Sequence, residues 1–207
     1  MSVLVVLDAD STLIQNEVIE LLAAEAGSLE LVAEITKRAM HGELDFSASL
    51  TERVATLANL DDGVFARAYQ QVVPTPGVRE LIAAVHAAGG TVGVVSGGFH
   101  EVLDQVQADL HFDLWRANRL EVTNHRLTGR VLGSVVDAQT KADMLLEWAE
   151  QVGATRTVAI GDGANDLKMM AVADLGIAFC AKPVVRAQAD VAIDEPNLAL
   201  AIDLIGL

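Results

Sequence analysis

Three short runs of mainly apolar residues constrain the fold of this chain more than any other feature. They lie at residues 3–7, 91–95 and 157–160, and their apolar residues are continuous rather than alternating with polar ones. Strands of this kind are buried on both faces, as in a parallel sheet covered by helices. Helical patterns separate the three runs. We therefore expect an α/β fold, with a Rossmann-like parallel sheet core and helices on both faces.

The segment from residue 15 to residue 74 carries helical patterns with no strand between them. A candidate N-cap stands before each of four patterns: Asn16, Ser28, Asp45, and Asp61 or Asp62. Gly27 is expected to end the first helix, and a loop at 41–45 to follow the second. We therefore predict a small helical domain at 15–74, inserted into a core that consists of residues 1–14 and 75–207.

Beyond residue 74, helices and strands alternate along the chain. Helices are expected at 78–88, at 99–109 and from Asp137 or Thr140 to residue 151. A hairpin at 120–133 has its turn near Asn124, and further strands are expected at 175–179 and 191–193. These elements complete the predicted sheet and its helical layers.

The composition excludes several classes of protein. The 207 residues carry a net charge of −15, which argues against binding to nucleic acid or to an anionic membrane surface. Cys180 is the only cysteine, so no disulfide forms within the chain, as is usual in a reducing compartment. No signal-peptide pattern and no apolar run of transmembrane length is present. We expect a cytoplasmic protein, and a homodimer is one oligomeric state that the sequence leaves open.

Polar segments follow each of the three predicted strands. They contain Asp8 and Asp10, then Ser96, Gly97 and Gly98, and finally Asp162, Asn165 and Asp166. The carboxyl ends of parallel strands meet at one edge of a sheet, where ligands bind in such folds. Two carboxylates about 4 Å apart repel by roughly 4 kcal/mol at an effective dielectric constant of about 20. Several together therefore require either a cation or protonation of one of them, and Mg²⁺, which takes oxygen ligands and substrate phosphates, suits this set.

Ser96, Gly97 and Lys141 supply groups that can bind an anion. A hydroxyl and unhindered backbone N–H groups at the start of a helix bind phosphate, and a nearby lysine neutralises it. Each residue alone is also typical of a strand-to-helix turn or of a solvated helix lysine. Their order on successive parallel strands, together with the acids, instead indicates phosphoryl transfer.

The motifs that contain these residues resemble those of the haloacid dehalogenase (HAD) superfamily of phosphatases. They are DADSTL at 8–13, VVSGGF at 94–99, a lysine on a following helix, and GDGANDL at 161–167. Longer segments, at 11–23, 44–57, 126–145 and 175–183, are similar to the branch of the superfamily that hydrolyses phosphoserine. The resemblance covers almost the whole chain, and it implies a HAD-like core in which the inserted helices form a cap.

The resemblance implies a role for each acidic residue. Asp8 would be the nucleophile that forms an aspartyl-phosphate, and Asp10 would be the general acid and base. Mg²⁺ would bind Asp8, the backbone carbonyl of Asp10, and Asp162, while Asp166 would orient ligands and water. Asp8 and Asp10 therefore need different protonation states, although one residue separates them.

The resemblance also implies how the substrate is held. Ser96, Gly97, Lys141 and Asn165 would bind the phosphoryl oxygens. In the inserted helices, Glu17 would pair with the substrate ammonium and Arg53 with its carboxylate.

Spacing alone favours a different interpretation of the inserted helices, in which Glu17 and Arg53 are solvated helix charges. Phe46 and Met40 are candidates for the apolar wall of the pocket, and core packing explains them equally well.

The expected reaction is Mg²⁺-dependent hydrolysis of O-phosphoserine to serine and phosphate, the last step of serine biosynthesis. Two alternatives keep the chemistry: transfer of the phosphoryl group to an amino-acid hydroxyl such as that of homoserine, and hydrolysis of another small phosphomonoester. An alternative of another class is a signalling receiver that accepts phosphate on an aspartate. The helical insertion and Asp10, a second acid suited to turnover, argue against a receiver.

Overall fold

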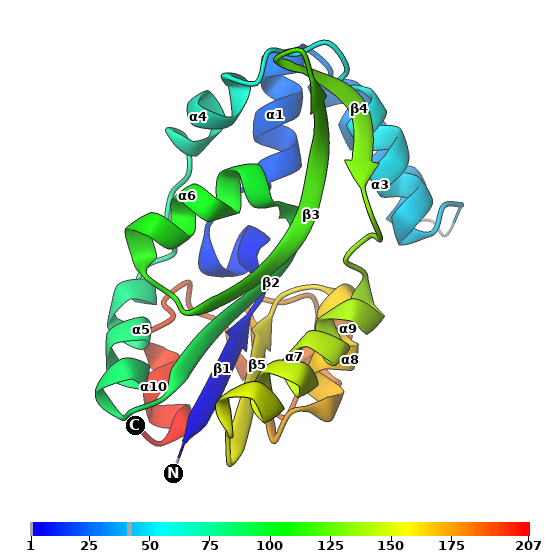
Figure 1. Ribbon diagram of the computed structural model, residues 1–207. Helices are drawn as coiled ribbons and strands as arrows, with labels where there is room; N and C mark the ends of the chain where they lie inside the picture. Colours follow the sequence, from blue (N-terminus) through cyan, green and yellow to red (C-terminus); the bar gives the residue numbers. More distant parts are fainter. Residues whose placement is uncertain (1, 41–42) are drawn as a thin grey trace.

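The computed structural model describes residues 2–40 and 43–207 (Figure 1). Within these residues the centre of the molecule is a seven-stranded sheet in the order β4-β3-β2-β1-β5-β6-β7. The strands are β1 (Val3–Leu7), β2 (Thr91–Phe99), β3 (Leu114–Thr123), β4 (Arg126–Leu132), β5 (Arg156–Gly161), β6 (Leu175–Phe179) and β7 (Val191–Ile193). All neighbouring strands are parallel except β3 and β4, which form an antiparallel hairpin. The predicted α/β class is confirmed.

Helices fill the chain between the strands. They are α1 (Val18–Ala26), α2 (Leu29–Met40), α3 (Phe46–Ala55), α4 (Val64–Tyr69), α5 (Val78–Ala87), α6 (His100–Leu110), α7 (Ala138–Val152), α8 (Leu167–Val172), α9 (Pro183–Arg186) and α10 (Leu200–Ile205). None of the helices in the described part of the chain is long and apolar enough to span a bilayer.

Both faces of β1 are buried, which explains its continuous apolar sequence. Val5 and Leu7 belong to a core that includes residues of α5 and α10. Leu4 and Val6 point to the other face, where they pack with residues of α7 and α8. Side chains alternate between the faces of a strand, so a sheet covered on both sides requires apolar residues at every position.

Helices α1 to α4 lie between β1 and α5 in the chain and gather beyond the carboxyl end of the sheet (Figure 1). The tip of the β3–β4 hairpin joins them there. The backbone N–H of Asn59 donates to the carbonyl of Leu127 over 2.8 Å, and the N–H of Leu127 donates to the carbonyl of Leu60 over 2.9 Å. The helical segment is therefore bonded to the hairpin as well as to the end of β1.

Several predicted helix boundaries are confirmed. Asp45 caps α3 by accepting the N–H of Ala48 over 2.7 Å. Asp137 caps α7 in the same way, by accepting the N–H of Thr140 over 2.8 Å. Gly27 ends α1 in the left-handed conformation, with φ 67°, which a residue without a Cβ adopts freely.

The cap predicted for α1 is wrong. The Asn16 side chain accepts the N–H of Val73 over 2.7 Å and ties the two ends of the inserted segment together. The first helical N–H, that of Val18, instead donates to the Asp10 carboxylate over 3.2 Å. A capping group that lies outside the helix cannot be identified from a local sequence pattern.

The other differences are shifts of boundaries. Helix α4 begins at Val64, so neither of the predicted N-caps, Asp61 or Asp62, directly precedes it. The Asp61 carboxylate forms an ion pair with Arg67. Strand β3 starts at Leu114 and pairs in parallel with β2 before it enters the predicted hairpin, whose turn is Asn124–His125. The loop expected at 41–45 includes residues 41 and 42, which lie outside the described residues, as does the Met40 side chain.

Candidate active site

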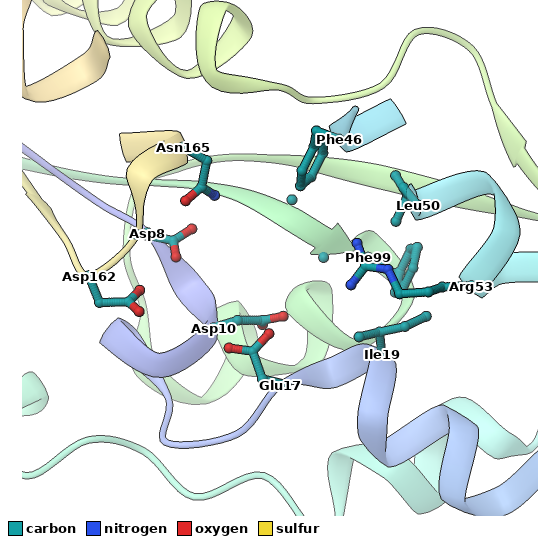
Figure 2. A pocket seen from close by; sticks show the side chains of 13 residues that line it. Asp8, Asp10, Glu17, Ile19, Phe46, Leu50, Arg53, Phe99, Asp162 and Asn165 are labelled. Atoms are coloured by element: carbon teal, nitrogen blue, oxygen red, sulfur yellow. The ribbon is translucent and has the colours of Figure 1, made fainter. Parts of the chain in front are cut away.

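A pocket of about 140 Å³ lies at the carboxyl ends of β1, β2 and β5, facing α1 and α3 (Figure 2). Its lining comes from five separated segments of the chain: Asp8 and Asp10; Glu17 and Ile19; Phe46, Leu50 and Arg53; Gly97, Gly98 and Phe99; and Asp162, Gly163 and Asn165. Most of the residues predicted for the site are thus brought together. Ser96, Lys141 and Asp166 do not line the pocket and are buried.

Lys141 is fully buried and bonds to two carboxylates. Its ammonium group donates to Asp8 and, over 2.6 Å, to Oδ1 of Asp166. Burial alone would lower the pKa of Lys141, but the two carboxylates outweigh it and raise this pKa above its ordinary value. Lys141 therefore stays charged and holds the Asp8 side chain in one orientation at the floor of the site.

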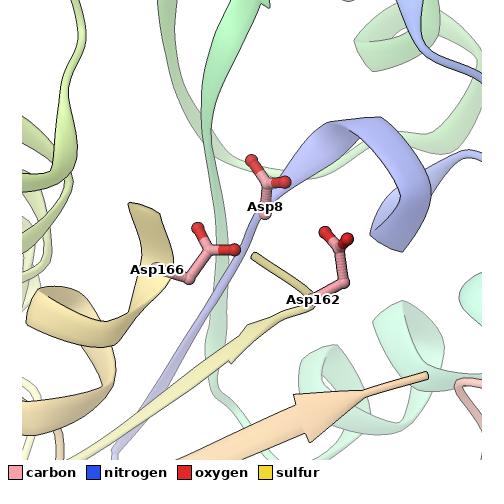
Figure 3. Close-up of side chains that lie close together, drawn as sticks. All are labelled: Asp8, Asp162 and Asp166. Carbon is pink, nitrogen blue, oxygen red and sulfur yellow. The ribbon is translucent and has the colours of Figure 1, made fainter. Parts of the chain in front are cut away.

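Asp8, Asp162 and Asp166 form a cluster in which one carboxylate oxygen of each lies within 4.8 Å of the others (Figure 3). Burial raises the pKa of Asp8, with Lys141 acting in the opposite direction. Burial and the neighbouring Asp166 charge raise the pKa of Asp162 to about 6. One lysine does not offset three carboxylates, so the cluster has the oxygen ligands and the excess negative charge that suit a divalent cation.

Asp10 differs from Asp8 in its surroundings. The chain leaves β1 in a turn, Ala9–Leu13, in which Ser11 has a φ of 58°, and this turn directs Asp10 towards the start of α1. Oδ2 of Asp10 accepts the N–H of Val18, while Oδ1 is buried and has no partner among the described residues. Burial and the Glu17 charge raise the pKa of Asp10 to about 8. Asp10 can therefore carry a proton that it can also give up.

Ser96, Gly97 and Gly98 form a bulge in β2. The pairing with β3 runs from Val95–Arg116 to Phe99–Asn118, so a four-residue step on β2 faces a two-residue step on β3. The Ser96 hydroxyl accepts the N–H of Gly98 over 2.8 Å. A Cβ at Gly98 would lie 3.0 Å from that hydroxyl oxygen, so a residue with a side chain would disturb the bulge.

Glu17 and Arg53 reach the pocket from the inserted helices (Figure 2). The Ser11 hydroxyl donates to Oε1 of Glu17 over 2.7 Å. Arg53 is anchored by its Nε, which donates to the carbonyl of Ser49 over 3.2 Å, and it forms no ion pair with any residue in the described ranges. Burial lowers the pKa of Arg53. A partly buried guanidinium without a carboxylate partner is suited to bind one from a ligand.

The structure also places residues in the site that sequence reasoning did not identify. Thr12 is fully buried, and its hydroxyl donates to Oδ1 of Asp162 over 3.3 Å. Ile19 and Leu50 extend the apolar wall on which Phe46, a candidate from the sequence, lies. In the sequence, Ile19 and Leu50 are marked only by the apolar stripe of their helices. Such a stripe does not distinguish residues that line a pocket from residues of the core.

The model of the haloacid dehalogenase-like hydrolase family matches residues 5–171 of the chain. The chain belongs to this family. It is 49% identical over 204 residues to a phosphoserine phosphatase of Streptococcus thermophilus, a match that covers 98% of this chain and 95% of that protein. It is 52% identical over 206 residues to a phosphoserine phosphatase of Streptomyces coelicolor, of which it spans 50%.

Solved structures agree with these relatives. A phosphoserine phosphatase described as a phospho-aspartyl intermediate analogue superposes with a TM-score of 0.92, at 40% identity over 98% of both chains. A substrate-bound phosphoserine phosphatase complex superposes with the same TM-score and identity, and this match covers 99% of this chain and 98% of that one. The fold that the sequence predicted is therefore that of the family.

Proposed function

We propose that this protein is a phosphoserine phosphatase, which hydrolyses O-phosphoserine to serine and phosphate through an aspartyl-phosphate. The observation that carries the proposal is the pocket itself. It joins two strand-end acids with different environments, Asp8 and Asp10, to a carboxylate and a guanidinium from the inserted helices, Glu17 and Arg53. The first pair suits phosphoryl transfer, and the second suits the ammonium and carboxylate of an amino acid. The close relatives with this name support the same substrate.

Asp8 acts as the nucleophile. One of its carboxylate oxygens forms a bond to phosphorus, the bond from phosphorus to the serine oxygen breaks, and Asp10 gives its proton to that oxygen. In the second half of the reaction a water attacks phosphorus, Asp10 takes a proton from the water, and the Asp8 carboxylate leaves. The raised pKa of Asp10, about 8, suits a group that is an acid in the first half and a base in the second.

The phosphoryl oxygens are bound on the side of the core. The proposed groups are the backbone N–H of Gly97 and the Asn165 amide, which line the pocket, and the Lys141 ammonium, which bonds to Asp8. Ser96 shapes the bulge that carries Gly97. Asp166 acts through other groups, because it bonds to Lys141 and accepts the N–H of Gly163 over 3.0 Å. It thereby holds the loop that carries Asp162 and Asn165.

Asp8, the backbone carbonyl of Asp10 and Asp162 are the proposed ligands of Mg²⁺, and Asp166 stands beside them. The bound ion would neutralise phosphoryl charge and keep Asp8 ionised. Thr12 orients Asp162 for this role through its hydroxyl.

The amino-acid part of the substrate faces the inserted helices. Arg53 binds the carboxylate, Glu17 binds the ammonium group, and Phe46, Ile19 and Leu50 cover the side of the pocket away from the strands. Residues 15–74 are a cap on the core formed by residues 1–14 and 75–207, and they exclude bulk water while the acyl-phosphate exists. The reaction is a step of serine biosynthesis, for which the cytoplasm is the expected location.

The test is a panel of phosphomonoesters assayed with Mg²⁺ and with a chelator. Phosphoserine should have the highest kcat/KM, and the chelator should abolish turnover. Product analysis with and without homoserine distinguishes hydrolysis from transfer. Phosphate release only in the presence of an acceptor, or a single turnover that leaves a stable phosphoprotein, would contradict the proposal.

A further inference from the structure

A buried asparagine outside the pocket connects two segments that carry groups proposed to bind the phosphoryl group. Asn118 lies on β3, is 2% exposed and does not line the pocket. Its Nδ2 donates to the carbonyl of Gly97 over 2.8 Å, and its Oδ1 accepts the N–H of Val136 over 2.8 Å. A backbone carbonyl only accepts and a backbone N–H only donates, so these two partners determine the orientation of the amide.

The bond from Asn118 to the Gly97 carbonyl takes the place of a β2–β3 ladder hydrogen bond that the bulge interrupts. The β2–β3 ladder has no regular pairing between Val95 and Phe99, because the bulge at Ser96–Gly98 interrupts it. A carbonyl inside a sheet that has no hydrogen-bond partner destabilises the local structure. Asn118 satisfies the Gly97 carbonyl from the β3 side, so the backbone of Gly97 is held in place while the residue lines the pocket.

The bond to Val136 connects Asn118 to the start of α7. Val136 is directly followed by Asp137, the N-cap of this helix, whose carbonyl accepts the N–H of Lys141 over 3.0 Å. Lys141 therefore stands one turn into a helix whose first residues Asn118 positions. A single amide thus links the Gly97 bulge to the residue before the N-cap of the helix that carries the lysine bound to Asp8.

We infer that Asn118 is a positioning residue for binding of the phosphoryl group, which acts through Gly97 and through the start of α7. The inference rests on the proposed function, since it assumes that a phosphoryl group binds at Gly97 and Lys141. It concerns the phosphate end of the pocket only. In the described part of the chain, the amide bonds to Gly97 and Val136 and not to Glu17 or Arg53, the residues proposed for the amino-acid end.

Asn118→Asp separates the two bonds with little change in shape. The aspartate still accepts the N–H of Val136, but its second oxygen cannot donate to the carbonyl of Gly97 and repels it. Binding of inorganic phosphate and of L-serine is measured separately by calorimetry in the presence of Mg²⁺, and kcat and KM are measured with phosphoserine. Asn124→Asp, at the exposed hairpin turn of β3 and β4, introduces the same charge and is the matched control.

The expected result for Asn118→Asp is a phosphate Kd about tenfold higher or more, and a kcat lower by a similar factor. The Kd of L-serine should stay within about twofold of the wild-type value, and Asn124→Asp should change neither constant. Unchanged phosphate binding in folded Asn118→Asp would overturn the inference. Equal weakening of phosphate and serine would also overturn it, because that pattern indicates general loosening of the fold.

If Asn118→Asp does not fold, Asn118→Ala, which removes both bonds without adding a charge, is judged by the same two dissociation constants. The wild-type data keep this inference separate from the proposed function. A wild type that binds phosphate but does not hydrolyse phosphoserine would contradict the proposed function. The phosphate and serine dissociation constants of the Asn118 variants would then still decide the role of Asn118. A wild type that binds no phosphate would overturn both.

Discussion

The ring of Phe46 lies directly on Gly97, so that a Cβ at Gly97 would come within 2.9 Å of the Phe46 Cζ. Phe46 is the first residue of α3, and Gly97 belongs to the bulge of β2. This contact joins the inserted helices to the core across the mouth of the pocket. It requires a residue without a side chain at position 97, which lines the pocket.

Phe46→Ala should therefore lower kcat/KM for phosphoserine by about tenfold, because the pocket loses its cover and admits water. The matched control is Phe65→Ala on α4, a partly buried phenylalanine that packs on the core and does not line the pocket. Steady-state kinetics on both variants check the prediction. Equal losses in the two variants would show that the effect comes from stability rather than from the cover of the site.

Asp8→Asn should abolish turnover, with kcat lower by about 10³-fold or more, because an amide is a poor nucleophile at phosphorus. The fold should persist, since the asparagine oxygen can still accept from Lys141. Circular dichroism and activity are measured together, with Asp143→Asn on the exposed side of α7 as the control. Near wild-type activity in Asp8→Asn would exclude Asp8 as the nucleophile.

Arg53→Ala should lower kcat/KM for phosphoserine by about 10²-fold, through loss of a charge-assisted bond to the substrate carboxylate. An aryl phosphate, which has no carboxylate in that position, should be hydrolysed as by the wild type. Arg38→Ala on α2, whose arginine pairs with Glu43 and Glu52, provides the control. If phosphoserine and the aryl phosphate are affected alike, Arg53 does not recognise the carboxylate.

Mg²⁺ should raise the melting temperature, because a ligand that binds only the folded state adds about 2.7 kcal/mol of stability at a hundred times its Kd. Asp162→Asn keeps the acceptor for the Thr12 hydroxyl but removes one charge from the cluster of Asp8, Asp162 and Asp166. It should lose most of the Mg²⁺-dependent shift, whereas Asp143→Asn should retain it. An equal shift in Asp162→Asn, measured by scanning calorimetry, would place the ion elsewhere.

Glu101, on α6, provides a test of pH dependence away from the pocket. Burial raises its pKa above the ordinary value of 4.5, and its Oε2 is buried without a partner in the described part of the chain. The folded state therefore binds a proton more tightly than the unfolded state. Stability from this group is present below about pH 4.5 and is lost as the pH rises through the folded-state pKa.

Glu101→Gln removes this ionisation and keeps an acceptor for the N–H of Leu120. The difference in free energy of unfolding, variant minus wild type, should rise as the pH increases above about 4.5, because only the wild type loses stability when Glu101 ionises. Urea unfolding at several pH values measures it, with Glu150→Gln, at an exposed position of α7, as the control. A difference that is constant with pH would show that the Glu101 pKa is not raised.

The sequence by itself determined the fold class and the acidic residues of the site. The runs at β1, β2 and β5 are apolar at nearly every position, because both faces of the sheet are covered, and a parallel sheet brings its strand ends to one edge. Asp8 and Asp162 therefore had to be neighbours. Local caps such as Asp45 were also predictable, since a helix N-terminus is satisfied by the residue beside it.

Only the tertiary structure decided which groups at distant positions bond to one another. Asp10 caps α1 in place of Asn16, Asp166 holds Lys141, and Asn118 connects Gly97 with Val136. Each of these bonds depends on the turn of a chain or on the register of a bulged strand. A polar residue in a sequence has many compatible partners, and burial in the folded chain selects one of them, because an unpaired polar group there is costly.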